Sequence, residues 1–340
     1  MNLLDLSHRV ASHPHLAKRL SYKDLVTFCD IVIWLKQEIC ACQSPSATSP
    51  PLSLPPNIHS FLADVFSLRD DEGTSVSDLW ALLCDIAWEE DSALNLESHR
   101  AHALAPLFLK YGPAHQLCLY NLRPPMRECL DPTCARKRVR LADGAYQTRG
   151  YELSEPRTFD AVVFTRELSP IPARVLSLYC RGCHTRYYPN YFVHEEASTR
   201  TYYHGLPPFI PITQKSYVSA EVCEMFATLM NISWTSATNC AQFYNLSCGK
   251  EDLSEYLPYD WKVSHELNPE LVWDAIFSYS LLLDHHERRE ALELPHNAPS
   301  QAERLRPAIQ ARNIRMEGPG QEHWSHACNL CCWVHTDDDG

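Results

Sequence analysis

The chain has 340 residues, of which 45% are hydrophobic and 10% aromatic, a composition typical of globular proteins and not of disordered ones. This length is enough for two or three domains, at roughly 100–200 residues per domain. No apolar run approaches the roughly 18 residues of a transmembrane helix, and residues 1–15 lack the apolar segment of a signal peptide. We therefore expect a protein that neither spans a membrane nor is secreted.

The formal net charge is −12, but the charges are unevenly distributed. Residues 120–190, the basic section, hold 12 Lys/Arg against 7 Asp/Glu, whereas the sections before and after it are acidic. A basic section inside an acidic protein is typical of a small nucleic-acid-binding module. The alternative is an ordinary solvated surface, and composition leaves both interpretations open.

Residues 1–112 are expected to form a helical leader domain. Apolar side chains recur at helical spacing, Ser21 and Ser77 stand where N-caps are needed, and the stretch 43–56 is too rich in Pro and Ser for a helix. Cys29, Cys40 and Cys42 are expected to be core or surface thiols. The helices of this domain are predicted at residues 21–42, 57–69, 77–91 and 100–110.

From residue 114 the periodicity changes to that of strands. Short runs rich in β-branched and aromatic residues alternate with turn residues, which predicts an antiparallel β section. The expected strands lie within 116–122, 146–153, 158–168, 174–179, 186–193 and 199–204.

Two cysteine pairs lie on turns of this β section: Cys129 with Cys134, and Cys180 with Cys183. Two close pairs separated by a β-rich insert are the sequence form of a zinc ribbon, in which four thiolates enclose a structural Zn²⁺. Pro132 would stiffen the first turn, and Gly182 is expected to supply a positive φ in the second. With 15 cysteines in a chain expected in a reducing compartment, metal ligation is favoured over disulfides.

Two alternatives to this four-cysteine site stay open. The cysteines could be buried reduced thiols that pack as small hydrophobic side chains, although their polar neighbours argue against it. His184 or His194 could replace one cysteine as a ligand.

A run of cations follows the first pair directly, comprising Arg136, Lys137, Arg138 and Arg140. Such a run could bind nucleic-acid phosphates, and a nuclear-localisation signal is a second, non-specific interpretation. Tyr187, Tyr188 and Tyr191 could stack on bases, although tyrosines in strands are more often half-buried packing residues.

The C-terminal part is predicted to be helical. Helices are expected over Ser219–Met230 and from Trp234 or Thr235 to Tyr244; they resemble a helix-turn-helix in length, but the second lacks cations, which favours an ordinary helical hairpin. A longer helix is predicted at 269–290, with Asn268 as N-cap and Pro269 in its first turn. Ser300 and Glu303 form a capping box for a last helix, which Pro307 should kink or interrupt.

The last residues form an incomplete second cysteine cluster. Cys328 and Cys331 have the spacing of half a zinc site, and no second pair follows, although His323, His326 or His335 could complete it locally. We favour the interpretation that the chain stops inside a second module.

These motifs together resemble the CxC-type cysteine-cluster domains associated with KDZ (Kyakuja–Dileera–Zisupton) transposases of basidiomycete fungi. The resemblance rests on the Cys-x4-Cys and Cys-x2-Cys pairs and on the stretch Trp-Thr-Ser-Ala-Thr-Asn-Cys-Ala-Gln-Phe-Tyr-Asn at 234–245. It is closest to the fifth type over residues 115–250, and residues 323–340 look like the opening of the sixth. Residues 1–112 and 251–320 match only in spacing and general character.

The resemblance implies a module that binds zinc and DNA and that precedes a transposase catalytic domain of ribonuclease-H-like fold in a longer chain. Cys129, Cys134, Cys180 and Cys183 would be the zinc ligands. The sequence departs from the family pattern in lacking the catalytic domain, since no section offers a βαβ framework with three acidic residues for divalent metals. We therefore expect no enzyme and no small-molecule substrate.

The overall expectation is an α+β protein, nuclear or otherwise cytoplasmic. It combines a helical N-terminal domain, a central antiparallel zinc-ribbon-like β section and a helical C-terminal part. The expected divisions are 1–112, 113–250, 251–320 and 321–340. The competing hypothesis is a protein-interaction module in which zinc is purely structural, and the salt dependence of DNA binding distinguishes the two.

Overall fold

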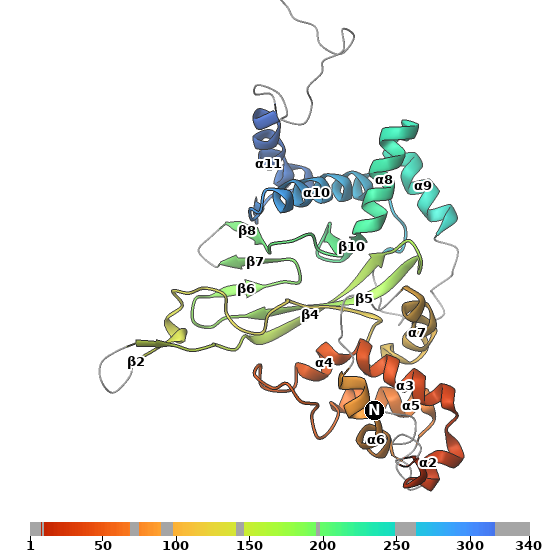
Figure 1. The fold of residues 1–340 in the computed structure, drawn as a ribbon. Helices are drawn as coiled ribbons and strands as arrows, with labels where there is room; N and C mark the ends of the chain where they lie inside the picture. Colours follow the sequence, from red (N-terminus) through yellow and green to blue (C-terminus); the bar gives the residue numbers. More distant parts are fainter. Residues whose placement is uncertain are drawn as a thin grey trace, which may run out of the picture.

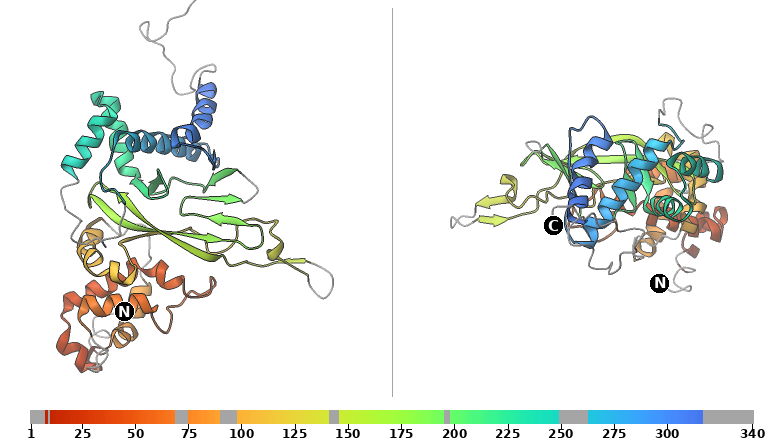
Figure 2. Two further views of the ribbon diagram at one scale, coloured as in Figure 1. Left: turned by 180° about the vertical axis from the view of Figure 1, so that it is seen from behind. Right: turned by 90° about the horizontal axis from the view of Figure 1, so that it is seen from above.

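The computed structural model describes residue 8 and residues 10–68, 75–89, 98–140, 146–194, 198–248 and 263–316. A central β-sheet separates the N-terminal helices from the C-terminal helices (Figure 1), and the view from behind shows the same layers (Figure 2). This arrangement confirms the α+β class with helices at both ends, whereas the zinc-ribbon-like character of the β section stays a prediction. No helix in the described ranges has both the length and the apolar character needed to cross a bilayer.

The leader forms the expected helices with some shifted boundaries. The first predicted helix is divided at Leu35, and its capping box between Ser21 and Asp24 is confirmed. The cap of α6 is Ser75 and not Ser77, since the Asp78 N–H donates to Ser75 Oγ at 3.2 Å. The helices are α2 (Pro14–Arg19), α3 (Tyr22–Trp34), α4 (Lys36–Cys40), α5 (Pro56–Phe66), α6 (Val76–Glu89) and α7 (Ser98–Tyr111), followed by the 3₁₀ turn η2 (Pro113–His115).

The central sheet has the strand order β11-β8-β7-β6-β5-β4-β10-β9, with β1 paired to β5. Most neighbours are antiparallel as expected, but β1 with β5 and β10 with β4 are parallel. The run expected as one strand at 186–193 is two strands joined by a tight turn. The strands are β1 (Tyr120–Leu122), β4 (Ser154–Phe164), β5 (Pro170–Tyr179), β6 (Thr185–Tyr187), β7 (Tyr191–His194), β8 (Thr199–Tyr202), β9 (Phe209–Pro211), β10 (Ser216–Ser219) and β11 (Glu293–Pro295).

A separate two-stranded sheet pairs β2 (Arg138–Arg140) with β3 (Tyr146–Thr148). It extends away from the rest of the molecule, at the left of Figure 1. The short 3₁₀ turn η3 (Ala135–Lys137) leads into it.

Alternation along β4 assigns the two faces of the central sheet to two hydrophobic cores. Ala161 and Val163 are buried with the leader helices, whereas Val162 and Phe164 are buried with the C-terminal helices. The leader therefore shares a core with the sheet, while the predicted division at residue 112 stays a prediction.

The second core is closed by α8 (Ala220–Ser233), α9 (Ala237–Ser247), α10 (Pro269–Glu287) and α11 (Gln301–Met316). The Asn268 cap is confirmed, because its side chain accepts from the Leu271 N–H, and Pro269 stands in the first turn. Pro307, expected to kink or interrupt the last helix, does not interrupt it, since α11 continues through it. Before Pro307, the Ser300 hydroxyl caps the helix by accepting the Glu303 N–H, and Leu305 is buried in the second core.

Candidate metal centre

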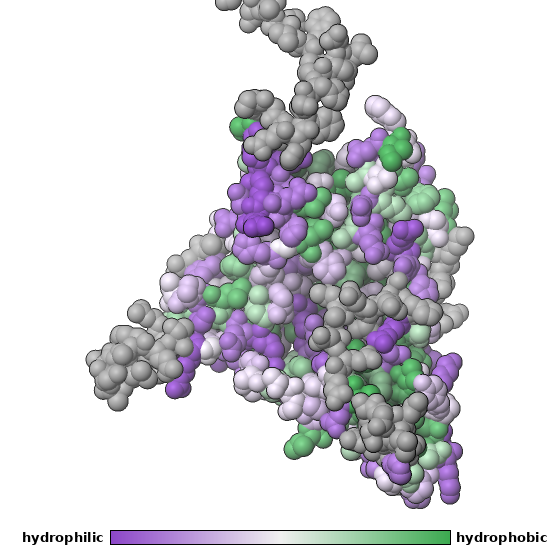
Figure 3. Space-filling view, viewed as in Figure 1, coloured by the Kyte–Doolittle hydropathy of each residue, from purple (hydrophilic) through white to green (hydrophobic). Residues whose placement is uncertain are grey.

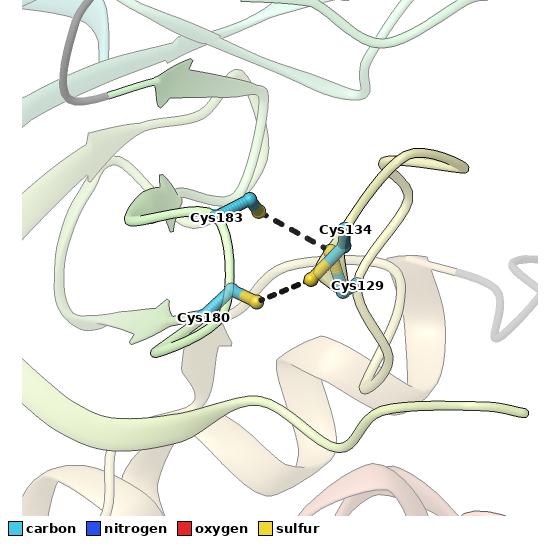
Figure 4. A group of neighbouring side chains, drawn as sticks. All are labelled: Cys129, Cys134, Cys180 and Cys183. Atoms are coloured by element: carbon cyan, nitrogen blue, oxygen red, sulfur yellow. Dashed lines mark hydrogen bonds between the residues drawn. The ribbon is translucent and has the colours of Figure 1, made fainter. Parts of the chain in front are cut away.

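The four predicted cysteines lie on two loops that face one another. The first loop, residues 129–134, is the first knuckle, and it leads through η3 into β2. The second loop, residues 180–183, is the second knuckle, and it forms the turn between β5 and β6. Figure 4 shows the side chains of both knuckles pointing into the space between them.

The four sulfur atoms are close enough for one metal ion. All lie within 4.8 Å of one another, with Cys129 Sγ at 3.5 Å from Cys183 Sγ and Cys134 Sγ at 3.7 Å from Cys180 Sγ. Zn–S bonds of about 2.3 Å in a tetrahedron place sulfurs about 3.8 Å apart, whereas a disulfide needs about 2.05 Å. The donor set therefore fits a tetrathiolate metal site and not a pair of disulfides.

Local hydrogen bonds, through a side chain in the first knuckle and through the backbone in the second, fix the shape of each turn. In the first, the Asp131 carboxylate accepts from the Thr133 N–H and the Thr133 hydroxyl, both at 2.7 Å. In the second, the Cys180 N–H donates to the Thr185 carbonyl and the His184 N–H to the Cys180 carbonyl, both at 2.9 Å. These hydrogen bonds shape the two turns that carry the four cysteine side chains.

Gly182 is needed in the second knuckle, but not for the reason expected. The residue with positive φ is His184, at 59°, and Gly182 is not in the left-handed region. A Cβ atom at Gly182 would lie 2.5 Å from Cys134 Sγ and 2.6 Å from Cγ of Arg136. Glycine therefore lets the two knuckles approach one another, and the predicted positive φ at Gly182 is wrong.

Hydrogen-bonding groups surround the sulfurs. Tyr187 Oη lies 3.4 Å from Cys129 Sγ and accepts the Leu130 N–H at 3.0 Å, so its own proton can be donated to the sulfur. Thr185 Oγ1 lies 3.2 Å from Cys183 Sγ, and the Gly182 N–H donates to Cys180 Sγ at 3.4 Å. Such outer partners orient ligands and stabilise their charge.

These outer partners were not identified from the sequence. The available signal was the alternation after Cys183, because Thr185 and Tyr187 are the inward-facing positions of β6. Lys137, which is predicted to contact DNA, also contacts the first knuckle: its ammonium donates to the Cys129 carbonyl at 2.8 Å. This contact brings a positive charge close to the four cysteines, which would all be thiolates in the metal-bound site.

Burial opposes ionisation and raises the pKa at three of the four thiols. Burial raises the pKa values of Cys129 and Cys180, and it raises the pKa of Cys183 to about 11. For Cys134, burial acts in the same direction but is outweighed by the Arg136 N–H and the neighbouring thiols, so its pKa is lowered. A divalent cation would offset the cost of holding all four as thiolates.

The histidine alternatives are not part of this group. Within the described ranges, the only cluster of three or more potential ligand atoms consists of the four cysteines. The His184 ring is directed to Tyr179, with Nδ1 at 2.7 Å from its hydroxyl. The second candidate pair, Cys328 and Cys331, lies outside the described residues.

Many cations of the basic section have structural partners. Arg127 donates to the carbonyls of Cys40 and Gln43, and Arg123 pairs with Glu38 at 3.1 Å, so both bind the end of α4. Two more arginines of the section lie at the second knuckle and the adjoining strands. Arg181 pairs with Glu155 at 2.7 Å, and Arg186 lies over the Tyr179 ring.

The tyrosines considered for base stacking are packing residues. Tyr187 and Tyr191 are buried, and Tyr188 stacks on Tyr191 with ring centroids 4.8 Å apart. Among the four basic residues of the run, Arg136 is exposed and Lys137 is engaged as above. Positions 138 and 140 belong to β2, outside the main body of the fold.

Comparison with known proteins gives one result for this region. Residues 117–248 match a family model described as "CxC5 like cysteine cluster associated with KDZ transposases", which confirms the resemblance over these residues. All four cysteines of the candidate centre lie inside the matched range. No curated protein and no solved structure matches the chain. The predicted opening of a sixth-type cluster at 323–340 lies outside the match.

Proposed function

Because residues 117–248 carry a CxC5-like cysteine cluster associated with KDZ transposases, we propose that the chain is a non-catalytic zinc module acting in a transposase context. Cys129, Cys134, Cys180 and Cys183 hold one Zn²⁺. The observation that carries the proposal is the convergence of four sulfurs from two loops at tetrathiolate spacing.

When bound, zinc supplies four metal–thiolate bonds that join the first knuckle to the β5–β6 turn. The chain's own residues do the rest: Asp131 holds the first turn, and Tyr187 and Thr185 donate to sulfurs. Four protein ligands leave no open coordination position, which supports a structural role and not an enzymatic one.

We assign the module to DNA binding, in the nucleus, with a transposase catalytic domain as a further partner. Support comes from the family match and from the basic section that surrounds the cysteines. Binding of this kind weakens steeply with salt, because cations that contact phosphates release counterions.

A protein-interaction module is the second candidate, and a specific surface favours it. The pair α8–α9 exposes Ile232, Trp234 and Leu246, with 92% of Trp234 accessible, and α9 carries no charged residue. Figure 3 shows hydrophobic surface at the tip of this helical pair. Exposed apolar patches of this kind occur at protein contacts.

Zinc content per chain tests the proposal, measured on protein purified without added metal for the wild type, Cys180→Ser and Cys42→Ser. We expect one zinc in the wild type and in Cys42→Ser, because Cys42 is exposed and lies outside the cluster. We expect none in Cys180→Ser. Folded wild-type protein without zinc would contradict the metal assignment, and two zincs would show a second working site.

A further inference from the structure

The helical hairpin formed by α8 and α9 exposes four large apolar side chains, which we call the hairpin face. It consists of Ile232, Trp234, Phe243 and Leu246, and between 47% and 92% of each residue is accessible to solvent. Figure 3 shows hydrophobic surface at the tip of this hairpin. Clustered apolar side chains on a protein surface are typical of a contact site.

The spacing along α9 brings these side chains together. Phe243 and Leu246 are three residues apart, so they lie on one side of the helix, opposite its buried side. At 1.5 Å per residue, Leu246 lies within about 18 Å of Trp234 along the chain axis. The buried side of α9 is formed by Ala237, Cys240, Ala241 and Tyr244.

Trp234 is held outward by an unfavourable backbone conformation. It is the C-cap of α8, with φ at 53° and ψ at 30°, the left-handed region that favours glycine or asparagine. A bulky aromatic residue is therefore unfavourable here for the backbone, and with 92% of the residue exposed its ring gains little from packing. Strain of this kind is found at positions that make functional contacts.

The chemistry of the hairpin face suits a second copy of the same chain. Residues 231–248 contain no charged side chain and no histidine, although the whole chain carries a net charge of −12. A two-fold contact brings the same surface of both copies together, so charged groups would meet their like. The exposed polar side chains of α9, which include Asn239 and Gln242, both donate and accept hydrogen bonds and can pair with identical groups.

The exposed area is sufficient for a dimer. A large side chain covers roughly 150–250 Å², so the exposed fractions of the four residues give roughly 400–700 Å² per copy. Two copies would bury about 900–1,400 Å² from these side chains alone. With the neighbouring polar residues, this reaches the range of stable interfaces, about 1,200–2,000 Å².

We infer that the chain forms a two-fold symmetric dimer in which the hairpin face of one copy packs on the hairpin face of a second copy. This inference rests on the second candidate function, the protein-interaction module, and names its partner. The hairpin and β2 lie at opposite ends of the molecule in Figures 1 and 2, so the contact is separate from the candidate metal centre.

Sedimentation velocity of the full chain tests the inference, at concentrations from about 1 to about 100 µM, since interfaces of this size have affinities of micromolar or tighter. The buffer contains a reductant, because Cys42 is exposed. Leu246→Glu changes the hairpin face, and Leu52→Glu is the matched control in the loop between α4 and α5. Both leucines are exposed, and both variants add one negative charge per chain. Zinc content and far-UV circular dichroism verify that each variant is folded.

We expect a dimer for the wild type and for Leu52→Glu. The dissociation constant of Leu246→Glu should rise at least about 100-fold, because the symmetric contact would place two glutamates in an apolar interface. The wild-type dimer should be nearly insensitive to salt between about 50 and about 500 mM, since its contact is uncharged.

Trp234→Gly separates contact from folding. Glycine accepts the left-handed conformation, so the monomer should unfold at the same or a higher denaturant concentration, measured in the monomeric Leu246→Glu background. In the wild-type background, loss of the ring should raise the dissociation constant at least about 30-fold. A lower unfolding midpoint with unchanged dimerisation would overturn the contact role of Trp234.

Three other results would overturn the inference. A zinc-loaded wild type that is monomeric at the highest concentration would exclude the second copy as partner, leaving the metal assignment intact and the protein-interaction candidate to a different protein. Equal effects of Leu246→Glu and Leu52→Glu would place the contact elsewhere. Dissociation by salt would indicate that the basic section of one copy binds an acidic surface of the other.

Discussion

The leader–sheet core and the cysteine centre are stabilised in different ways. The first buries a large set of apolar side chains from six helices and the central sheet, including Phe28, Phe61 and Trp80. The second contains five buried residues, of which three are candidate metal ligands: Cys129, Cys134, Leu153, Cys180 and Tyr187. Apolar burial stabilises in proportion to area, so we expect the first region to fold without metal and the second to depend on a bound metal.

We therefore expect metal binding to stabilise one region of the molecule and not the whole. The second knuckle sits on β5, which also contributes Ile171, Ala173 and Val175 to the leader core. Among the described residues, the cysteines of the first knuckle are buried in a small cluster with Leu153, Cys180 and Tyr187. Zinc should therefore order the first knuckle and the start of the β2–β3 pair, while the central sheet remains folded without zinc.

Removal of zinc with a chelator is the strongest test of this contrast. We expect amide hydrogen-exchange protection to collapse at residues 127–140 and 146–153 and to persist in α3, α5 and β4. Structural zinc contributes about 10–16 kcal/mol of apparent binding free energy in small zinc domains, more than the small apolar cluster can replace. The effect should reverse on addition of Zn²⁺.

The measurement is peptide-resolved exchange with and without chelator, with the Cys42→Ser variant treated in parallel. Its profile should equal that of the wild type, since Cys42 is exposed and far from the sulfur cluster in sequence. Loss of protection throughout the leader would show that zinc supports the whole fold, and an unchanged profile would show that the knuckles need no metal.

The reverse perturbation is Phe61→Ala in the leader core. Phe61 is fully buried on α5, and its ring lies 4.9 Å from that of Phe108, so truncation should cost about 3–5 kcal/mol of unfolding free energy. Denaturant unfolding checks this value, with Phe61→Leu as the volume-retaining control. Zinc content of the folded variant should stay at the wild-type level, and its loss would show that the two regions are not separate.

Much of the candidate site could be predicted from the sequence, because ligand spacing is a local property. The four cysteines, the turn residues around them and the adjacent cations are all visible in two short stretches. The role of Gly182 could not be predicted from the sequence, since its close approach to Cys134 Sγ joins residues 48 positions apart in the chain. The contact of Lys137 with the Cys129 carbonyl could likewise not be predicted, because it depends on how the first knuckle folds.

The fold class could be predicted for a similar reason, and the sheet topology could not. Helical periodicity and the caps at Ser21 and Asn268 are local patterns. The short strands β9, β10 and β11 carry no periodicity long enough to detect, and their pairing depends on tertiary contacts. Pro307 is another position where tertiary contacts override a local preference, because the packing of α11 outweighs the tendency of proline to break a helix.

The smallest expected effect separates two roles of Tyr187 at the cysteine centre: packing by its ring and hydrogen bonding by its hydroxyl. Tyr187→Phe keeps the buried ring and removes the hydroxyl that lies 3.4 Å from Cys129 Sγ. Burial raises the pKa of this hydroxyl, so it stays protonated and can donate to a thiolate. Loss of an outer partner of this kind weakens metal binding by about 10–100-fold, which is the expected range here.

Competition with a chromophoric chelator measures this change, and Tyr188→Phe is the matched control. Tyr188 is the neighbouring tyrosine, and its ring stacks on Tyr191 instead of facing the sulfurs, so its zinc affinity should not change. Equal affinities for all three proteins would show that the ring alone supports the centre by packing. A selective loss in Tyr187→Phe would show that a hydrogen bond from the sheet stabilises the thiolate charge, which the four ligands cannot do by themselves.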